Sequence, residues 1–108
     1  MSAPHRGSPR VLHIVMMAFK EAMTAPLRAR IEQAFDDVRR QCAGVMCFDL
    51  VDNHSRTSPD FTHALLSVFA GDEALAAYRT GRAHEEMMAV LGPHIERIVV
   101  LDSVLDPA

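Results

Sequence analysis

Several features that would narrow the function of a protein are scarce in this sequence of 108 residues. It has no tryptophan and only two cysteines, Cys42 and Cys47, too few for a disulfide framework or for two cysteine pairs around zinc. No apolar run approaches the roughly 20 residues of a membrane span, and the first residues lack the apolar stretch of a signal peptide. We therefore expect a cytoplasmic protein with free thiols and no membrane partner.

An excess of basic charge is also missing. The 11 Lys and Arg residues are outnumbered by 14 Asp and Glu residues, so no basic stripe is available to follow a phosphate backbone, and nucleic acid is not an expected partner. Apolar side chains are plentiful at 49% of the chain, enough at this length for one domain with a buried core. We expect a flexible N-terminal tail over residues 1–10 and a single domain over residues 11–105.

Four apolar segments have the composition of β-strands. They are expected at residues 11–19, 45–51 and 61–69 and within residues 95–105. Nearly every position of the first segment is apolar, which indicates a strand that is buried on both faces.

Two helical segments are expected between these strands. The first begins after Thr24, which can cap it, and ends before Gly44, where a left-handed backbone is favoured. The second runs over residues 71–79, is broken at Gly81, and resumes over residues 83–91.

The order strand, helix, strand, strand, helix, strand predicts an α+β protein of the ferredoxin-like class. In this fold a four-stranded antiparallel sheet carries its helices on one face. The strands are nevertheless apolar on both sides, and an uncovered apolar sheet face is rare in monomers. The pattern therefore predicts a homodimer that is closed sheet against sheet.

Four side chains are the main candidates for chemistry. His13 and His63 lie in apolar strands, where an imidazole needs a hydrogen-bond partner or a cavity. Tyr78 and His84 are six residues apart, which on an unbroken helix would separate them by about 240°. A break at Gly81 allows both to face one cavity, where they form a plausible proton-transfer pair.

The histidines could instead serve the core or bind a metal. For His13 or His63 taken alone, the commoner role is that of a core histidine that is merely hydrogen-bonded. Three histidines can also bind zinc or copper, but the sequence has no HxH or HxxxH spacing and no evident carboxylate partner. No metal site and no cofactor are therefore expected.

Short segments spread over most of the chain form a recognisable pattern. They are His13-Ile14-Val15, Phe19-Lys20, Gly44-Val45, Thr62-His63-Ala64-Leu65, Phe69, Glu73-Ala74-Leu75, Tyr78, Ala83-His84 and Val99-Val100-Leu101-Asp102. Together they resemble the stress-responsive dimeric α/β-barrel (Dabb) family. The resemblance implies a ferredoxin-like protomer, a homodimeric barrel, and a cavity between sheet and helices in each subunit.

One plant member of that family is a polyketide cyclase that performs an intramolecular aldol condensation. Tyr78 and His84 match its tyrosine and histidine pair, and His13 and His63 match its strand histidines. The family commonly reads His-Pro-Ala-His where this chain has Gly81-Arg82-Ala83-His84. The resemblance implies that Arg82 adds a cation near the pocket mouth, which would favour an acidic ligand.

We therefore expect a small-molecule pocket and cofactor-independent cyclase-like lyase chemistry on a carbonyl compound, with an aromatic or polyketide-like acid as the ligand. His84 would remove a proton beside the carbonyl, and Tyr78 would hold His84 or polarise the oxygen. The expected ligand-binding residues are His13, His63, Val15, Met17, Leu65, Phe69 and Arg82. The alternative is a stable dimeric stress-response or interaction module without catalysis. An oxygenase shares the fold, but no set of residues selects it.

Overall fold

The computed structural model of the chain describes residues 9–105. Most of the expected N-terminal tail, residues 1–8, lies outside the described residues. The elements are β1 (Val11–Phe19), α1 (Ala25–Gln41), β2 (Val45–Asp52), β3 (His63–Phe69), α2 (Asp72–Arg79), α3 (Arg82–Leu91) and β4 (Ile95–Val104), with a 3-10 turn over Gly92–His94. The predicted strands and helices are confirmed with boundaries shifted by at most two residues.

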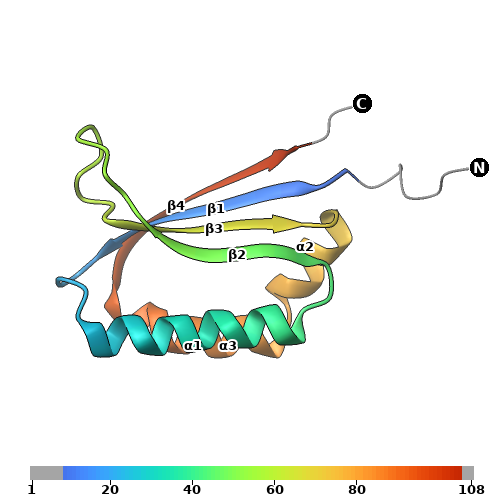
Figure 1. Cartoon of the computed structure of the whole chain (residues 1–108), viewed down its shortest axis with the longest axis horizontal. Coiled ribbons are helices and arrows are strands. Elements are labelled where there is room, and N and C mark those ends of the chain that lie inside the picture. Colours follow the sequence, from blue (N-terminus) through green and yellow to red (C-terminus); the bar gives the residue numbers. More distant parts are fainter. Residues whose placement is uncertain (1–8, 106–108) are drawn as a thin grey trace, which may run out of the picture.

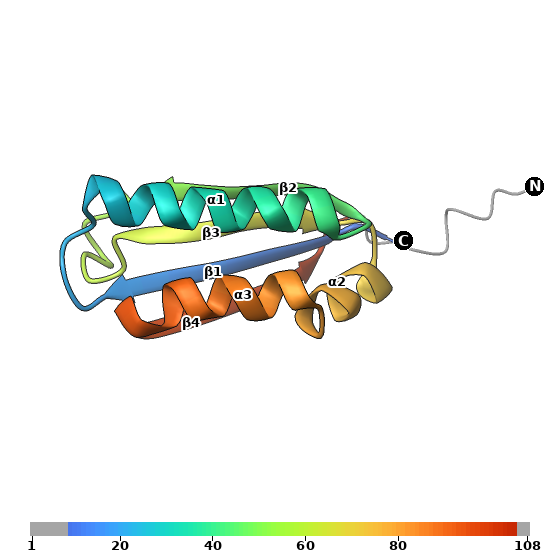
Figure 2. The same ribbon diagram turned by 90° about the horizontal axis from the view of Figure 1, so that it is seen from below.

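The four strands form one antiparallel sheet in the order β2-β3-β1-β4. All three helices lie on the same face of this sheet (Figure 1). Seen from the helix side, α1 runs along β2 and β3, α3 runs along β1 and β4, and α2 lies at one end (Figure 2). The predicted ferredoxin-like fold is confirmed.

Helix α1 supplies much of the core. Thr24 caps it by accepting a hydrogen bond from the backbone N–H of Leu27 at 3.2 Å, and Pro in the first turn costs no helical hydrogen bond. One side of the helix is buried against the sheet: Leu27, Ile31, Ala34, Phe35 and Val38. This burial explains why α1 packs on the sheet over β2 and β3.

The register of the sheet determines which side chains share a row. His13 of β1 lies opposite Ser67 of β3 and Asp102 of β4, while Met17 lies opposite His63. The positions of His13 and His63 are therefore four residues apart along the strands, about 13 Å at 3.3 Å per residue. The sequence left this register open. The observed register keeps the two imidazoles apart.

No helix of the described residues covers the other face of the sheet (Figure 1). Strand alternation places large apolar residues of β1, β3 and β4 on this outer face: Leu12, Ile14, Met16, Leu66, Val68, Val99 and Leu101. Val99 and Leu101 are 53% and 51% exposed. An exposed apolar patch of this kind on one sheet face marks an interaction surface.

The turn after α1 depends on Gly44. Its φ of 83° lies in the left-handed region, and a Cβ built there would lie 2.5 Å from the Cβ of Ala74. We expect Gly44→Ala to destabilise the fold by about 2 kcal/mol, because both the backbone strain and the close contact must be relieved. Chemical denaturation measures this loss.

Gly92→Ala is the matched control. Gly92 has φ −51° and ψ −45°, and a Cβ there would meet no atom within 4 Å. Its substitution is expected to be neutral or to stabilise by up to about 1 kcal/mol. Equal losses for the two variants would contradict the role of Gly44.

Candidate functional site

A cavity of about 400 Å³ lies between the helix side of β1 and β4 and the helices α2 and α3. Four residues with polar groups line it: His13, Tyr78, Arg79 and His84. The other lining residues are apolar: Val15, Met17, Leu65, Met87, Met88, Leu91, Ile95, Ile98 and Val100. Such a pocket, mostly apolar with a few convergent polar groups, has the make-up of a small-molecule site.

The break between α2 and α3 brings Tyr78 and His84 together. Gly81 has an extended backbone, with φ −87° and ψ 162°, so α3 starts in a new direction after α2 ends at Arg79. The two rings meet edge to face, with centroids 4.9 Å apart. Both line the same cavity, as the glycine break predicted.

His13 is held by a hydrogen-bonded chain across β1, β4 and α2. Its Nδ1 lies 2.6 Å from Oδ1 of Asp102, and Arg79 donates to Oδ2 of the same carboxylate at 2.6 Å. Since the carboxylate accepts, Nδ1 of His13 is the donor. Asp102 therefore sets both the tautomer and the orientation of an imidazole that is only 7% exposed.

The protonation states of this group suit acid–base chemistry. Burial, together with the nearby His13 and Arg79, lowers the pKa of His84, so its imidazole is neutral and basic at pH 7. Burial, with a smaller effect from Cys42, raises the pKa of Tyr78 above its usual value, which keeps the phenol protonated. The pair thus combines a neutral base with a hydrogen-bond donor.

The pKa of Asp102 is governed by competing effects. Burial alone would raise the pKa of this carboxyl, but the hydrogen bonds from His13 and Arg79 outweigh it and bring the pKa below its usual value. Asp102 is consequently ionised at neutral pH.

The remaining predicted residues are not all brought together. Three of them line the pocket: Val15, Met17 and Leu65. Phe69 is fully buried behind it, with its ring centroid 6.1 Å from that of His13 and 5.1 Å from that of Tyr78. Arg82 is exposed and lines a separate hollow beside Cys42, so its cation is not part of this pocket.

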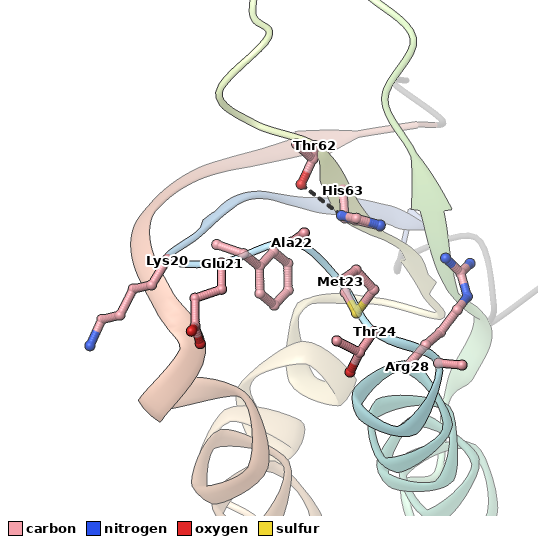
Figure 3. A pocket seen from close by; sticks show the side chains of 10 residues that line it. Lys20, Glu21, Ala22, Met23, Thr24, Arg28, Thr62 and His63 are labelled. Atoms are coloured by element: carbon pink, nitrogen blue, oxygen red, sulfur yellow. Dashed lines mark hydrogen bonds between the residues drawn. The ribbon is translucent and has the colours of Figure 1, made fainter.

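His63 lies at the opposite end of the sheet, beside a second and more open cavity of about 630 Å³ (Figure 3). Its Nδ1 shares a 2.7 Å hydrogen bond with the Thr62 hydroxyl, and its Nε2 is 3.6 Å from Asp52, which also pairs with Arg28. Burial lowers the pKa of His63, an effect that Asp52 partly offsets. His63 is thus separated from the other three candidates.

Across residues 9–105, no group of three or more His, Cys, Asp or Glu side chains is arranged to hold a metal ion. Over the same residues, no helix has both the length and the apolar character needed to span a bilayer.

A comparison with protein families finds a decisive match. The model of the stress responsive A/B barrel domain, Dabb, matches residues 11–105. The chain belongs to the Dabb family. The comparison with curated proteins found no match in sequence.

Several solved structures share the fold of this chain at low sequence identity. A Dabb family protein from Mesorhizobium loti is 19% identical, with a TM-score of 0.77 over 92% of this chain and 99% of that one. A hydroxynitrile lyase from Passiflora edulis is 18% identical, with a TM-score of 0.78 and coverage of 94% and 97%. A dimeric ferredoxin-like protein of unknown function from Jannaschia sp. is 19% identical, with a TM-score of 0.78 and coverage of 89% and 99%.

Sequence reasoning missed Arg79 as a lining residue of the pocket and Asp102 as the hydrogen-bond partner of His13. A signal for Asp102 was present, because it directly follows the apolar run Ile98-Val99-Val100-Leu101 in a strand expected beside the first one. Its partnership with His13 required the register between β1 and β4. Arg79 gave no signal, since a basic residue in the last turn of a helix is common.

Asp102→Asn tests the hydrogen-bonded chain from His13 to Arg79. Because the pKa of Asp102 is lower in the folded state, its contribution to stability is present above about pH 4 and is lost as the pH falls through the folded-state pKa. We expect the variant to be about 1 kcal/mol less stable at pH 7, a value already reduced for solvent exposure, and to lose less stability on acidification. Urea unfolding at pH 7 and pH 3 measures both effects.

Glu86→Gln is a control that removes the same charge from an exposed helix position. It should keep the acid dependence of the wild-type chain. If Asp102→Asn also kept the acid dependence of the wild-type chain, the contact with His13 would contribute nothing to the free energy of unfolding.

Proposed function

We propose that this Dabb protein is a cofactor-independent enzyme that performs acid–base chemistry on a small carbonyl compound in the pocket beside Tyr78. The reaction class is proton removal next to a carbonyl group, the first step of a cyclase-like or lyase reaction. The observation that carries the proposal is the pairing of a neutral imidazole, His84, with a buried protonated phenol, Tyr78, at one end of an apolar cavity.

Each polar side chain has a distinct role in this proposal. His84 is the base that takes the proton, because its lowered pKa keeps its lone pair available. Tyr78 donates a hydrogen bond to the carbonyl oxygen, where negative charge develops. His13, fixed by Asp102, offers Nε2 to orient the ligand.

The hydroxynitrile lyase from Passiflora edulis lends support to a lyase reaction, since that protein has this fold. This support concerns only the fold, because a structure that is 18% identical shows a shared fold and not a shared reaction. The proposal therefore rests on the residues of this chain.

The alternative is a Dabb dimer with no reaction, in which the histidines only complete the core. One observation favours it: His13 already has its polar partner in Asp102, as a structural core histidine would. The alternative gives no role to a base with a lowered pKa that lines a cavity. The two functions differ in one respect: the proposed enzyme transfers a proton at His84, and the alternative does not.

We also propose that the protein acts in the cytoplasm. Cys42 and Cys47 are both free thiols, which fits a reducing compartment.

Deuterium exchange tests the proposed base without knowledge of the substrate. In D2O, the protein should catalyse exchange of the protons beside the carbonyl of 2-heptanone, followed by NMR. His84→Ala should lower this rate by about 100-fold, because a positioned general base contributes roughly 10²–10⁴. The exposed His54→Ala is the control and should exchange like the wild type.

Two results would contradict the proposal. One is a wild-type rate no faster than buffer alone. The other is an equal loss of rate in His84→Ala and His54→Ala, which would exclude a specific role for the pocket histidine.

We infer that a second copy of the chain covers the outer face of the sheet. This face carries the exposed Val99 and Leu101, and the helices cover only the other side. Similar structures are described as dimeric, including the Jannaschia protein, although that likeness extends only to the fold. A sheet-to-sheet dimer would turn this apolar surface into a shared core.

Leu101→Asp tests the dimer by light scattering. A carboxylate buried between two sheets without a partner should raise the dissociation constant at least about 100-fold, so the variant should be monomeric at micromolar concentration. Ala89→Asp, on the exposed side of α3, should leave the mass unchanged. A monomeric wild-type chain, or a variant that stays dimeric, would refute this interface.

A further inference from the structure

Asp52, Thr62 and His63 form a second polar cluster, at the end of the sheet where β2 ends and β3 begins. Asp52 lies directly opposite His63 in the register of these two strands. Beyond that pair, the backbone N–H of Asn53 donates to the carbonyl of Thr62 at 2.9 Å, so the pairing of the two segments continues past His63. None of the three residues lines the pocket beside Tyr78. The cluster is therefore separate from the proposed catalytic pocket.

Both ring nitrogens of His63 face a polar neighbour. Nδ1 shares a 2.7 Å hydrogen bond with the Thr62 hydroxyl, and Nε2 lies 3.6 Å from Oδ1 of Asp52. An ionised carboxylate only accepts, so it favours the tautomer in which Nε2 carries the proton and Nδ1 has the lone pair. The Thr62 hydroxyl is then the donor to Nδ1. The order of hydroxyl, imidazole and carboxylate is that of a nucleophile, its base and the group that orients the base.

Two further contacts hold the base and the carboxylate. The ring of Phe19 packs edge to face against that of His63, with centroids 5.5 Å apart. Arg28 of α1 donates to Oδ1 of Asp52 at 3.1 Å, and this hydrogen bond holds the pKa of the carboxyl below its usual range. Burial lowers the pKa of His63, which keeps its imidazole neutral at pH 7. The carboxylate is thus ionised and the imidazole is a free base, as the order of the three groups requires.

The hydroxyl of this cluster lies at an open cavity of about 630 Å³ (Figure 3). Thr62 and His63 line it from the sheet, and the segment between β1 and α1 lines it from below. Phe19 and Met23 supply apolar surface to the same cavity. Thr62 is exposed, so a ligand in the cavity can reach its oxygen. Apolar side chains beside a hydroxyl suit an ester, which has an apolar acyl group attached to an electrophilic carbon.

Arg28 brings a cation to this cavity. It extends from α1 toward the level of His63 (Figure 3). Its Nη1 donates to Asp52 and its Nε lies 3.7 Å from Glu32, so neither contact uses Nη2. Because a guanidinium has several N–H donors, Arg28 can hold Asp52 and also stabilise the negative charge that develops on a carbonyl oxygen under attack.

We propose that Thr62 is the nucleophile of a second site, at which the protein hydrolyses small carboxylic esters through an acyl-threonine intermediate. The Thr62 oxygen forms a bond to the acyl carbon while its proton passes to Nδ1 of His63. The C–O bond to the leaving group then breaks, and the alcohol departs with that proton. Water next attacks the acyl carbon and gives a proton to His63. The carboxylic acid leaves as this proton returns to the Thr62 oxygen.

Hydrolysis of p-nitrophenyl acetate tests the site, because the absorbance of the released nitrophenol gives the rate. The wild-type protein should hydrolyse this ester faster than buffer alone. Thr62→Val removes the hydroxyl and keeps the shape of the side chain, and a β-branched residue suits a position next to a strand. This variant should lower kcat/KM by about 100-fold, since it has lost both the nucleophile and the proton that His63 accepts.

Thr57→Val is the matched control. Thr57 is exposed, and its hydroxyl bonds to that of Ser55 and not to a histidine. The control should hydrolyse the ester at the wild-type rate. Circular dichroism should show the same helix and strand content in Thr57→Val, Thr62→Val and the wild-type protein.

A fluorophosphonate probe identifies the nucleophile in the wild-type protein itself. The probe should transfer its phosphonyl group to the Thr62 oxygen as fluoride leaves and the hydroxyl proton passes to His63. Mass spectrometry of the digested protein should find this group on the peptide that contains Thr62. His63→Gln should abolish the labelling, because a glutamine amide is not a base.

Three results would overturn the proposal. The first is a wild-type rate no faster than that of buffer. The second is equal hydrolysis by Thr62→Val and Thr57→Val. The third is a wild-type protein that carries no phosphonyl group, or one that carries it on a residue other than Thr62.

Discussion

The pairing of β1 with its two neighbours is the constraint on which the rest of the site depends. Because β1 is central, its register with β4 places Asp102 beside His13, and its register with β3 sends His63 to the far end. A shift of one residue would turn His13 to the outer face of the sheet. The hydrogen bond between His13 and Asp102 thus exists only in this register.

The second constraint is the short gap between α2 and α3. A continuous helix would direct Tyr78 and His84 to different sides, whereas the extended backbone at Gly81 lets their rings touch over the end of the pocket. Their pKa shifts follow from this placement, since burial disfavours both the tyrosinate and the imidazolium. Local backbone geometry therefore decides the protonation states available for chemistry.

The two faces of the sheet have different surroundings. The helices enclose one face and leave a pocket there that is polar at one end and apolar along its length. The opposite face stays apolar and uncovered by any helix, which suits association with a second copy. The proposed dimer contact and the proposed ligand site therefore use different faces of the same strands.

The sequence by itself determined the elements, the fold class and the family, because apolar periodicity, the Thr24 cap and the glycines at 44 and 81 are local signals. It also indicated the meeting of Tyr78 and His84, which only six residues of chain separate. Tertiary structure alone decided that Asp102 and Arg79 join His13 and that His63 and Arg82 lie elsewhere. Those placements depend on strand register and helix packing between residues far apart in the chain, and no local pattern encodes either one.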